Sequence, residues 1–152
     1  MLKMGVKPII AKCVIFGWYD RKKIGIKENG TTYKILIVDD SPMIHKMIKK
    51  TLEPIGFVIV GNAKNGKEGV ELYNKLKPDL VTMDITMPIM DGVDASKYII
   101  QIEPTAAILM LSAMGDEEIK MQAKANGVTY FLTKPFQPSE LIKSIIYTLN
   151  IK

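Results

Sequence analysis

Five apolar runs alternate with five amphipathic stretches along residues 33–152. The runs cover residues 34–38, 57–61, 80–83, 106–111 and 129–133, and they do not alternate apolar and polar positions. Continuous apolar runs are typical of parallel strands that helices cover on both faces. The pattern predicts an α/β domain with an open, doubly wound, five-stranded parallel sheet, right-handed crossovers and five helices.

Boundary signals mark several of the expected helices. Ser41 can cap the first helix and Pro42 can open it, and the fourth extends from a cap near Asp116 to Asn126-Gly127. The other helices are expected near residues 66–76, 92–102 and 138–149. The third is expected to bury four side chains, those of Val93, Tyr98, Ile99 and Ile102. The fourth has only a thin apolar face, which predicts weak anchoring to the sheet.

Composition limits the possible classes of protein. A chain of 152 residues with a 47% apolar share is long enough for one domain with a sizeable core. The net charge of +5 is not spread over the chain, because residues 1–30 hold seven basic and two acidic residues. The remaining 122 residues are balanced, so we expect no nucleic-acid-binding surface on them. The single cysteine, Cys13, excludes a disulfide framework and fits a reducing cytoplasm.

The first thirty residues contain an apolar stretch from Pro8 to Tyr19, interrupted by Lys12. It is shorter than the roughly 20 apolar residues of a membrane-spanning helix. Arg21-Lys22-Lys23 follows it, whereas a signal peptide would end at small residues. We therefore expect residues 1–32 to be an extension of unknown role, with no membrane insertion, and residues 33–152 to be the functional domain.

Charged side chains follow three of the apolar runs at their carboxyl ends. Asp39 and Asp40 come after the first run, Asp84 after the third, and Lys134 after the fifth. Carboxyl ends of parallel strands meet at one edge of a sheet, where ligands bind. Such acids could serve only as helix caps, but capping does not require three of them at adjacent strand ends. Crowded carboxylates are costly unless a cation joins them, so the cluster indicates a function.

The chemistry that fits these side chains is phosphoryl transfer to a carboxylate. Asp84 can act as a nucleophile toward phosphorus and form an acyl phosphate. Asp40 and Asp84, with the backbone carbonyl of Thr86, can bind Mg2+, and Asp39 can orient a water of the metal. Lys134 can hold the phosphoryl oxygens. The hydroxyl of Ser112 and the backbone N–H of Ala113 can contact the remaining oxygen.

Four segments carry a family resemblance: VDDSP (38–42), MDITMPIMDG (83–92), SAMG (112–115) and KPF (134–136). In this order and spacing they resemble the receiver domain of bacterial response regulators, over residues 33–152, and most closely its single-domain chemotaxis type. The resemblance implies a flavodoxin-like strand order of 2-1-3-4-5. It also implies a phosphoacceptor (Asp84), an acidic metal pocket (Asp39, Asp40), a switch hydroxyl (Ser112), a phosphate-sensing cation (Lys134) and a switch aromatic (Phe131). The Lys134-Pro135 bond is then expected to be cis.

The same resemblance implies partners. The phosphoryl group would come from a sensor histidine kinase, and a phosphatase could remove it. Output would be the binding of a target, such as a flagellar motor switch, through the face formed by the fourth helix, the fifth strand and the fifth helix. A phosphorelay intermediate or a phosphate sink outside chemotaxis is the alternative.

Four other interpretations are weaker. An aspartyl-phosphate phosphatase needs a second acid two residues after its nucleophile, where Thr86 follows Asp84. A flavin-binding module needs a phosphate loop that Asp39 and Asp40 would repel. Phe131 could simply belong to the core, and His45, among lysines on the first helix, is expected to be an exposed histidine rather than a phosphohistidine.

Overall fold

The computed structural model describes residues 23–151, in which five parallel strands form one sheet in the order β2-β1-β3-β4-β5. The strands are β1 (Lys34–Val38), β2 (Val58–Ala63), β3 (Leu80–Asp84), β4 (Ile108–Ser112) and β5 (Tyr130–Thr133). The predicted fold class and strand order are confirmed. Strands β2 and β4 begin and end later than the apolar runs 57–61 and 106–111 had indicated.

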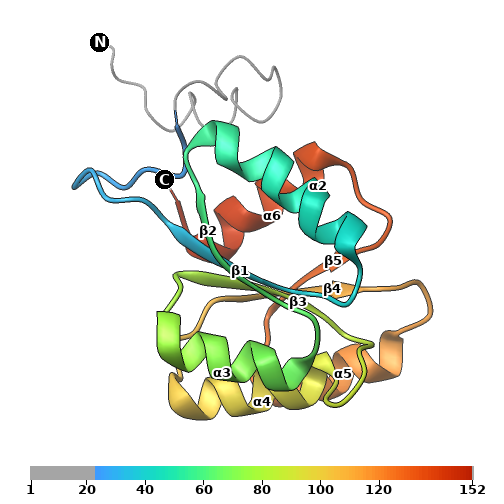
Figure 1. Ribbon diagram of the computed structural model, residues 1–152. Coiled ribbons are helices and arrows are strands. Elements are labelled where there is room, and N and C mark those ends of the chain that lie inside the picture. Colours follow the sequence, from blue (N-terminus) through green and yellow to red (C-terminus); the bar gives the residue numbers. More distant parts are fainter. Residues whose placement is uncertain (1–22, 152) are drawn as a thin grey trace.

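Helices cover both faces of the sheet (Figure 1). One face carries α2 (Pro42–Leu52), which continues into the short 3-10 helix η2 (Glu53–Ile55), and α6 (Pro138–Leu149). The other face carries α3 (Gly66–Leu76), α4 (Gly92–Ile102) and α5 (Glu117–Ala125). Among residues 23–151, none of these helices has both the length and the apolar character needed to cross a bilayer.

Side-chain caps explain where three of the helices begin. Ser41, Asn65 and Asp91 each accept a hydrogen bond from the backbone N–H three residues later, at 3.4, 2.9 and 2.8 Å. Each bond satisfies one of the amide groups that a helix start leaves without a partner. Three of the strand–helix connections are therefore fixed by local sequence, which also fixes the loops at the carboxyl edge of the sheet.

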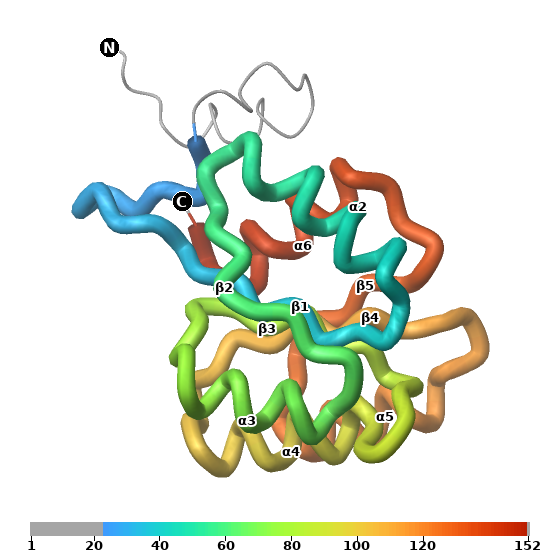
Figure 2. Tube along the Cα trace, viewed as in Figure 1, coloured from blue at the N-terminus to red at the C-terminus, as the bar shows by residue number. Residues whose placement is uncertain are grey.

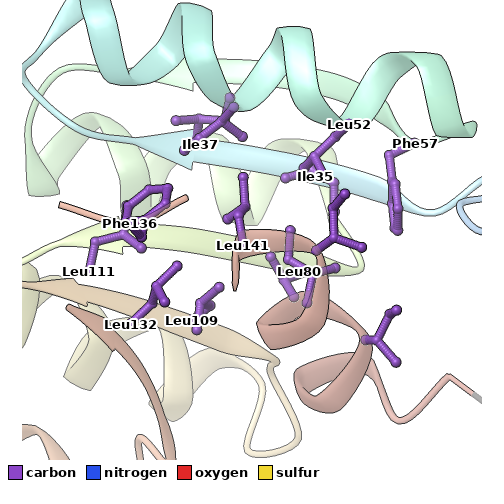
Figure 3. Packing of buried hydrophobic residues seen from close by; sticks show 14 of the residues in the cluster. Ile35, Ile37, Leu52, Phe57, Leu80, Leu109, Leu111, Leu132, Phe136 and Leu141 are labelled. Atoms are coloured by element: carbon purple, nitrogen blue, oxygen red, sulfur yellow. The ribbon is translucent and has the colours of Figure 1, made fainter. Parts of the chain in front are cut away.

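The core forms two clusters, one on each side of the sheet. The cluster under α2 and α6 contains Ile35, Ile37, Leu80, Leu109 and Leu141, among others (Figure 3). Strands β3 and β4 are buried at every position, and β1 at all but its first. The edge strands β2 and β5 are only partly covered. Continuous apolar runs therefore predicted double-sided burial correctly for the three inner strands alone.

Helix α4 buries a different face from the one expected. Val93 and Ile99 are buried, but Tyr98 is 49% exposed and Ile102 is 42% exposed. The buried face is completed by Ala95 and Ser96, which lie at helical spacing from Val93 and Ile99. Small residues at these positions allow α4 to pack close to its neighbours, and they were missed because only large apolar residues were counted.

Residues 23–33 pack against the end of the sheet opposite the charged cluster. The N–H of Gly25 donates to the carbonyl of Ile55 at 2.8 Å, and the N–H of Tyr33 donates to the carbonyl of Gly25 at 2.7 Å. Lys27 forms an ion pair with Asp79 at 3.1 Å. This segment lies near the end of the chain that follows α6 (Figure 2). Cys13 and the apolar stretch 8–19 fall outside the described residues, and the predicted domain boundary near residue 33 stays a prediction.

Candidate functional site

Three carboxylates meet at the carboxyl edge of the sheet. Asp39 follows β1 directly, Asp40 is the next residue, and Asp84 is the last residue of β3, the strand beside β1. One oxygen from each side chain lies within 4.8 Å of the other two. Asp39 and Asp84 are buried, whereas Asp40 is exposed. The expected convergence of these acids is what the structure shows.

Lys134, which follows β5, reaches across this edge to two of the acids. Its Nζ lies 3.0 Å from Oδ2 of Asp39 and 3.1 Å from Oδ1 of Asp84. The Lys134-Pro135 peptide bond is cis. The backbone N–H of Lys134 donates to the carbonyl of Ser112 at 2.7 Å, which ties the β5–α6 loop to the end of β4. The ammonium group of Lys134 is therefore shared by two carboxylates, and the third carboxylate, that of Asp40, lies next to them.

The surroundings of Asp84 raise its pKa, so this carboxyl group ionises only at a higher pH than an ordinary aspartate. Burial, and then the charge of Asp39, raise the pKa of Asp84 from 3.8 to about 6, although Lys134 opposes this shift. Burial alone would lower the pKa of Lys134, but the hydrogen bonds and charges of Asp39 and Asp84 outweigh burial and raise it. Lys134 stays charged, and the cluster keeps an excess of negative charge that a further cation would relieve.

Backbone amides hold the two buried acids in place. Oδ1 of Asp39 accepts from the N–H of Ser41 at 2.8 Å, and Oδ1 of Asp84 accepts from the N–H of Ile85 at 3.0 Å. The loop after β3 folds back closely, since the N–H of Gly92 donates to the carbonyl of Ile85 at 2.7 Å. A Cβ on Gly92 would overlap the backbone oxygen of Asp84, so only glycine fits there.

The donor set fits Mg2+. Carboxylate oxygens are the ligands that this hard cation prefers, and it usually takes only one or two of them from the protein. The carboxylates of Asp40 and Asp84 are close enough to share an ion. Burial and the charge of Asp39 raise the pKa of Asp84, and a cation bound there would favour its ionised form. Thr86 is exposed in the loop two residues after Asp84. Its backbone carbonyl as a third ligand remains a prediction.

Ser112 is the last residue of β4, the strand next to β3. Its Oγ is buried and, within residues 23–151, makes no hydrogen bond. A buried hydroxyl without a partner is costly in a folded protein. The hydroxyls of Thr82 and Ser96 share this feature, and Ser112 differs from them in lying at the carboxyl end of its strand, next to β3. The neighbouring N–H of Ala113 does have a partner, Oδ2 of Asp116 at 2.7 Å.

Phe131 lies in the middle of β5, paired with Met110 of β4, and is half-buried. Its ring contacts two cations from α5, since the Nζ atoms of Lys120 and Lys124 each lie 5.6 Å from the ring centroid. The ring also packs against the core cluster on the side of α3, α4 and α5. The ring of Phe131 therefore faces α5.

The sequence analysis missed the position of His45. This histidine is half-buried rather than exposed. Its Nε2 lies 2.6 Å from the backbone carbonyl of Asp39, and its Nδ1 lies 2.8 Å from Oδ1 of Asn62 on β2. The carbonyl oxygen of Asp39 only accepts, so Nε2 donates this bond, and in a neutral ring Nδ1 then accepts from the Asn62 amide with its NH2 group turned toward the histidine. The position of His45 one turn after the cap Ser41 was the only signal in the sequence that it could reach the Asp39 loop.

Comparison with known proteins gives a consistent result. A family model described as "Response regulator receiver domain" matches residues 35–146. The Chemotaxis protein CheY of Thermotoga maritima is 46% identical over 112 residues, which cover 74% of this chain and 93% of that protein. The Chemotaxis protein CheY of Bacillus subtilis is 48% identical over 118 residues, with coverages of 78% and 98%. In the CheX-CheY-BeF3-Mg2+ complex of Borrelia burgdorferi, a solved chain 32% identical to this one superposes with a TM-score of 0.78, over 82% of this chain and 96% of that one.

Proposed function

This chain belongs to the response regulator receiver family, and we propose on that premise that Asp84 accepts a phosphoryl group from a sensor histidine kinase. Members of this family are phosphoacceptor signalling domains rather than enzymes with a turnover substrate. The observation that carries the assignment of Asp84 is its location. It is a buried carboxylate at the carboxyl end of β3, beside two other acids and the ammonium group of Lys134.

In the proposed reaction, an oxygen of Asp84 attacks phosphorus, a P–O bond forms, and the P–N bond to the donor histidine breaks. The leaving imidazole keeps the bonding electron pair and takes up a proton from water. Oδ1 of Asp84 is engaged by Ile85 and Lys134, so Oδ2 is the better candidate for the attacking oxygen. Bound Mg2+, held by Asp40 and Asp84, would neutralise charge that builds up on the phosphoryl oxygens.

Two donors are proposed for the phosphorylated state. Lys134 can exchange its contact with Asp84 for a phosphoryl oxygen, because it is already within 3.1 Å of the acceptor carboxylate. The free hydroxyl of Ser112 can turn toward another phosphoryl oxygen. Movement of the Ser112 side chain would open space for the ring of Phe131 on the adjacent strand. Because this ring contacts α5, its rotation would transmit the change to that helix. A local charge change would thereby bias a packing arrangement with two alternatives.

We propose the surface of α5, β5 and α6 as the output face. It carries exposed apolar side chains from each element, including Met121, Tyr130 and Tyr147. Helix α5 buries only Ala123, so little packing energy holds it in one position. The printed names of the similar proteins, Chemotaxis protein CheY, support a role in chemotaxis. The target that we propose for the output face is a flagellar motor switch. The complex of a similar CheY with CheX supports a second protein partner for this domain, and we propose that one such partner is a phosphatase.

The test is phosphorylation by a small donor. The protein is incubated with acetyl phosphate and Mg2+, and its intact mass is measured over time. Wild type should gain one phosphoryl group, and Asp84→Asn should gain none. Asp94→Asn, which changes an aspartate in the first turn of α4, is the matched control and should be labelled like wild type. An unlabelled wild type, or a labelled Asp84→Asn, would refute the proposal.

A further inference from the structure

The loop between β4 and α5 is closed by one strong hydrogen bond. Oδ2 of Asp116 accepts from the backbone N–H of Ala113 at 2.7 Å, and the N–H of Asp116 donates to the carbonyl of Ala113 at 3.3 Å. Gly115, with a φ of +91°, provides the left-handed backbone that lets the chain turn back on itself. A bond from an amide to a carboxylate is short and stronger than one between neutral groups.

Asp116 occupies the N-cap position of α5 but does not cap this helix. Its side chain makes no hydrogen bond to an amide of the first turn, unlike those of Ser41, Asn65 and Asp91 at the starts of α2, α3 and α4. The sequence had suggested a cap near Asp116, and that interpretation of its side chain is wrong. The carboxylate instead holds the residue that follows Ser112.

This contact conflicts with the phosphorylated state. Asp84 pairs with Leu111 across β3 and β4, so Ser112 and Ala113 come just beyond the acceptor carboxylate. They carry the two groups that are suited to donate to a phosphoryl oxygen there. The hydroxyl of Ser112 is free, but the N–H of Ala113 is occupied. An N–H that points at one carboxylate at 2.7 Å is not available to a second anion.

We propose that Asp116 is an internal competitor of the phosphoryl group for the N–H of Ala113. In the unphosphorylated protein the Asp116 carboxylate holds the β4–α5 loop closed. When Asp84 is phosphorylated, the N–H turns to a phosphoryl oxygen, and the loop and the first turn of α5 are released. One charge-assisted hydrogen bond replaces another, so the two arrangements are close in free energy. Release occurs at the start of the weakly anchored helix α5, which connects the site to the output face.

This inference rests on the proposed function. It predicts that a variant without the native Asp116–Ala113 hydrogen bond binds a phosphoryl-like ligand more tightly than wild type does. The probe is beryllium trifluoride with Mg2+, which binds to a carboxylate as a phosphoryl group would, measured by calorimetry on the full chain. Asp116→Ala should bind at least about tenfold more tightly than wild type, since a net hydrogen bond to a charged group no longer has to be broken. Asp116→Asn, which keeps an uncharged acceptor, should fall between the two.

Loss of negative charge near the site could also strengthen binding, so a control is needed. Glu118 lies exposed in the same first turn of α5. Glu118→Gln removes the same charge and leaves the Ala113 contact intact, and it should bind the probe like wild type. If Asp116→Ala binds no more tightly than wild type or Glu118→Gln, the competition is refuted. If wild type itself fails to bind the probe, the proposed function fails instead.

A second measurement uses wild type alone, so it does not depend on whether a variant folds. The amide of Ala113 can be followed by NMR together with the side-chain carboxylate carbon of Asp116 in wild type. Addition of Mg2+ and beryllium trifluoride should shift the Asp116 carboxylate signal, because it loses its amide partner, while the Ala113 amide stays protected from exchange. An Asp116 signal that does not move when the probe binds would overturn the proposal.

Discussion

Replacement of Asp84 with asparagine is expected to stabilise the protein at neutral pH when Mg2+ is absent. Burial and the charge of Asp39 raise the pKa of Asp84 to about 6, so the folded state binds a proton more readily than the unfolded chain. A group with a raised pKa contributes its full stability below its unfolded value. That contribution is lost as the pH rises from 3.8 through about 6. Asparagine has nearly the shape of the protonated acid and carries no charge, so it avoids the loss.

The magnitude follows from the shift. From 3.8 to about 6, at about 1.4 kcal/mol per pH unit, ionised Asp84 costs the fold about 3 kcal/mol at pH 8. Because the side chain is only 12% exposed, solvent screening reduces this value little. Addition of Mg2+ should stabilise wild type and leave Asp84→Asn less affected, so the difference between them should shrink.

The assay is urea unfolding with a metal chelator at pH 8 and at pH 4. The difference in unfolding free energy between Asp84→Asn and wild type should be large at pH 8 and small at pH 4. Glu71→Gln, which changes an exposed carboxylate on α3, is the control and should show little difference at either pH. An Asp84→Asn protein that is no more stable than wild type at pH 8, or equally stabilised at both values, would refute the reasoning.

Three further substitutions test the supports of the site. Gly92→Ala should destabilise the fold by about 2 kcal/mol or more, because a Cβ there overlaps the backbone oxygen at the end of β3; a normal urea midpoint would contradict this. Lys134→Met should lower the free energy of unfolding by about 2–3 kcal/mol at pH 8 without Mg2+, since two carboxylates lose their shared cation. In a thermal melt, Mg2+ should restore part of the lost stability. His45→Ala should cost about 1 kcal/mol through loss of the hydrogen bond to Asp39, whereas Lys46→Ala at the exposed next position should cost little; equal urea midpoints for the two would count against a role for His45.

Local signals explain why so much of the fold could be predicted. Helices α3, α4 and α6 begin and end at the predicted residues, since Asn65, Asp91 and the Gln137–Glu140 capping box fix their starts. The inner strands were predicted because burial on both faces demands continuous apolar residues. The edge strand β2 begins one residue later than its apolar run and the inner strand β4 begins two residues later, because Phe57 and Ala106-Ala107 are apolar and at least half-buried before either strand starts.

The candidate site divides in the same way. Asp39, Asp84 and Lys134 come at strand ends, so the parallel topology alone brings them together. The contacts of His45 and Asp116 depend on which way a side chain turns within a loop. The side chain of His45 contacts Asn62 on the neighbouring strand β2, and the side chain of Asp116 contacts the N–H of Ala113, three residues earlier in the same loop. The spacing of residues in the sequence predicts neither contact. Sequence patterns predict where a residue lies in an element, whereas its hydrogen-bond partner depends on the packed tertiary structure.

Stability and function oppose each other at this edge of the sheet. Within residues 23–151, the fold holds a buried Asp84 beside Asp39 with one ammonium group, that of Lys134, between them, and the raised pKa of Asp84 reflects the cost of ionising it there. The same excess negative charge favours a divalent cation, which adds binding energy that a neutral pocket would lack. The free hydroxyl of Ser112 is a second unfavourable feature that a phosphoryl oxygen would relieve. A site that is unfavourable when empty can change its surroundings when filled, because the free energy released on binding is available to move the β4–α5 loop.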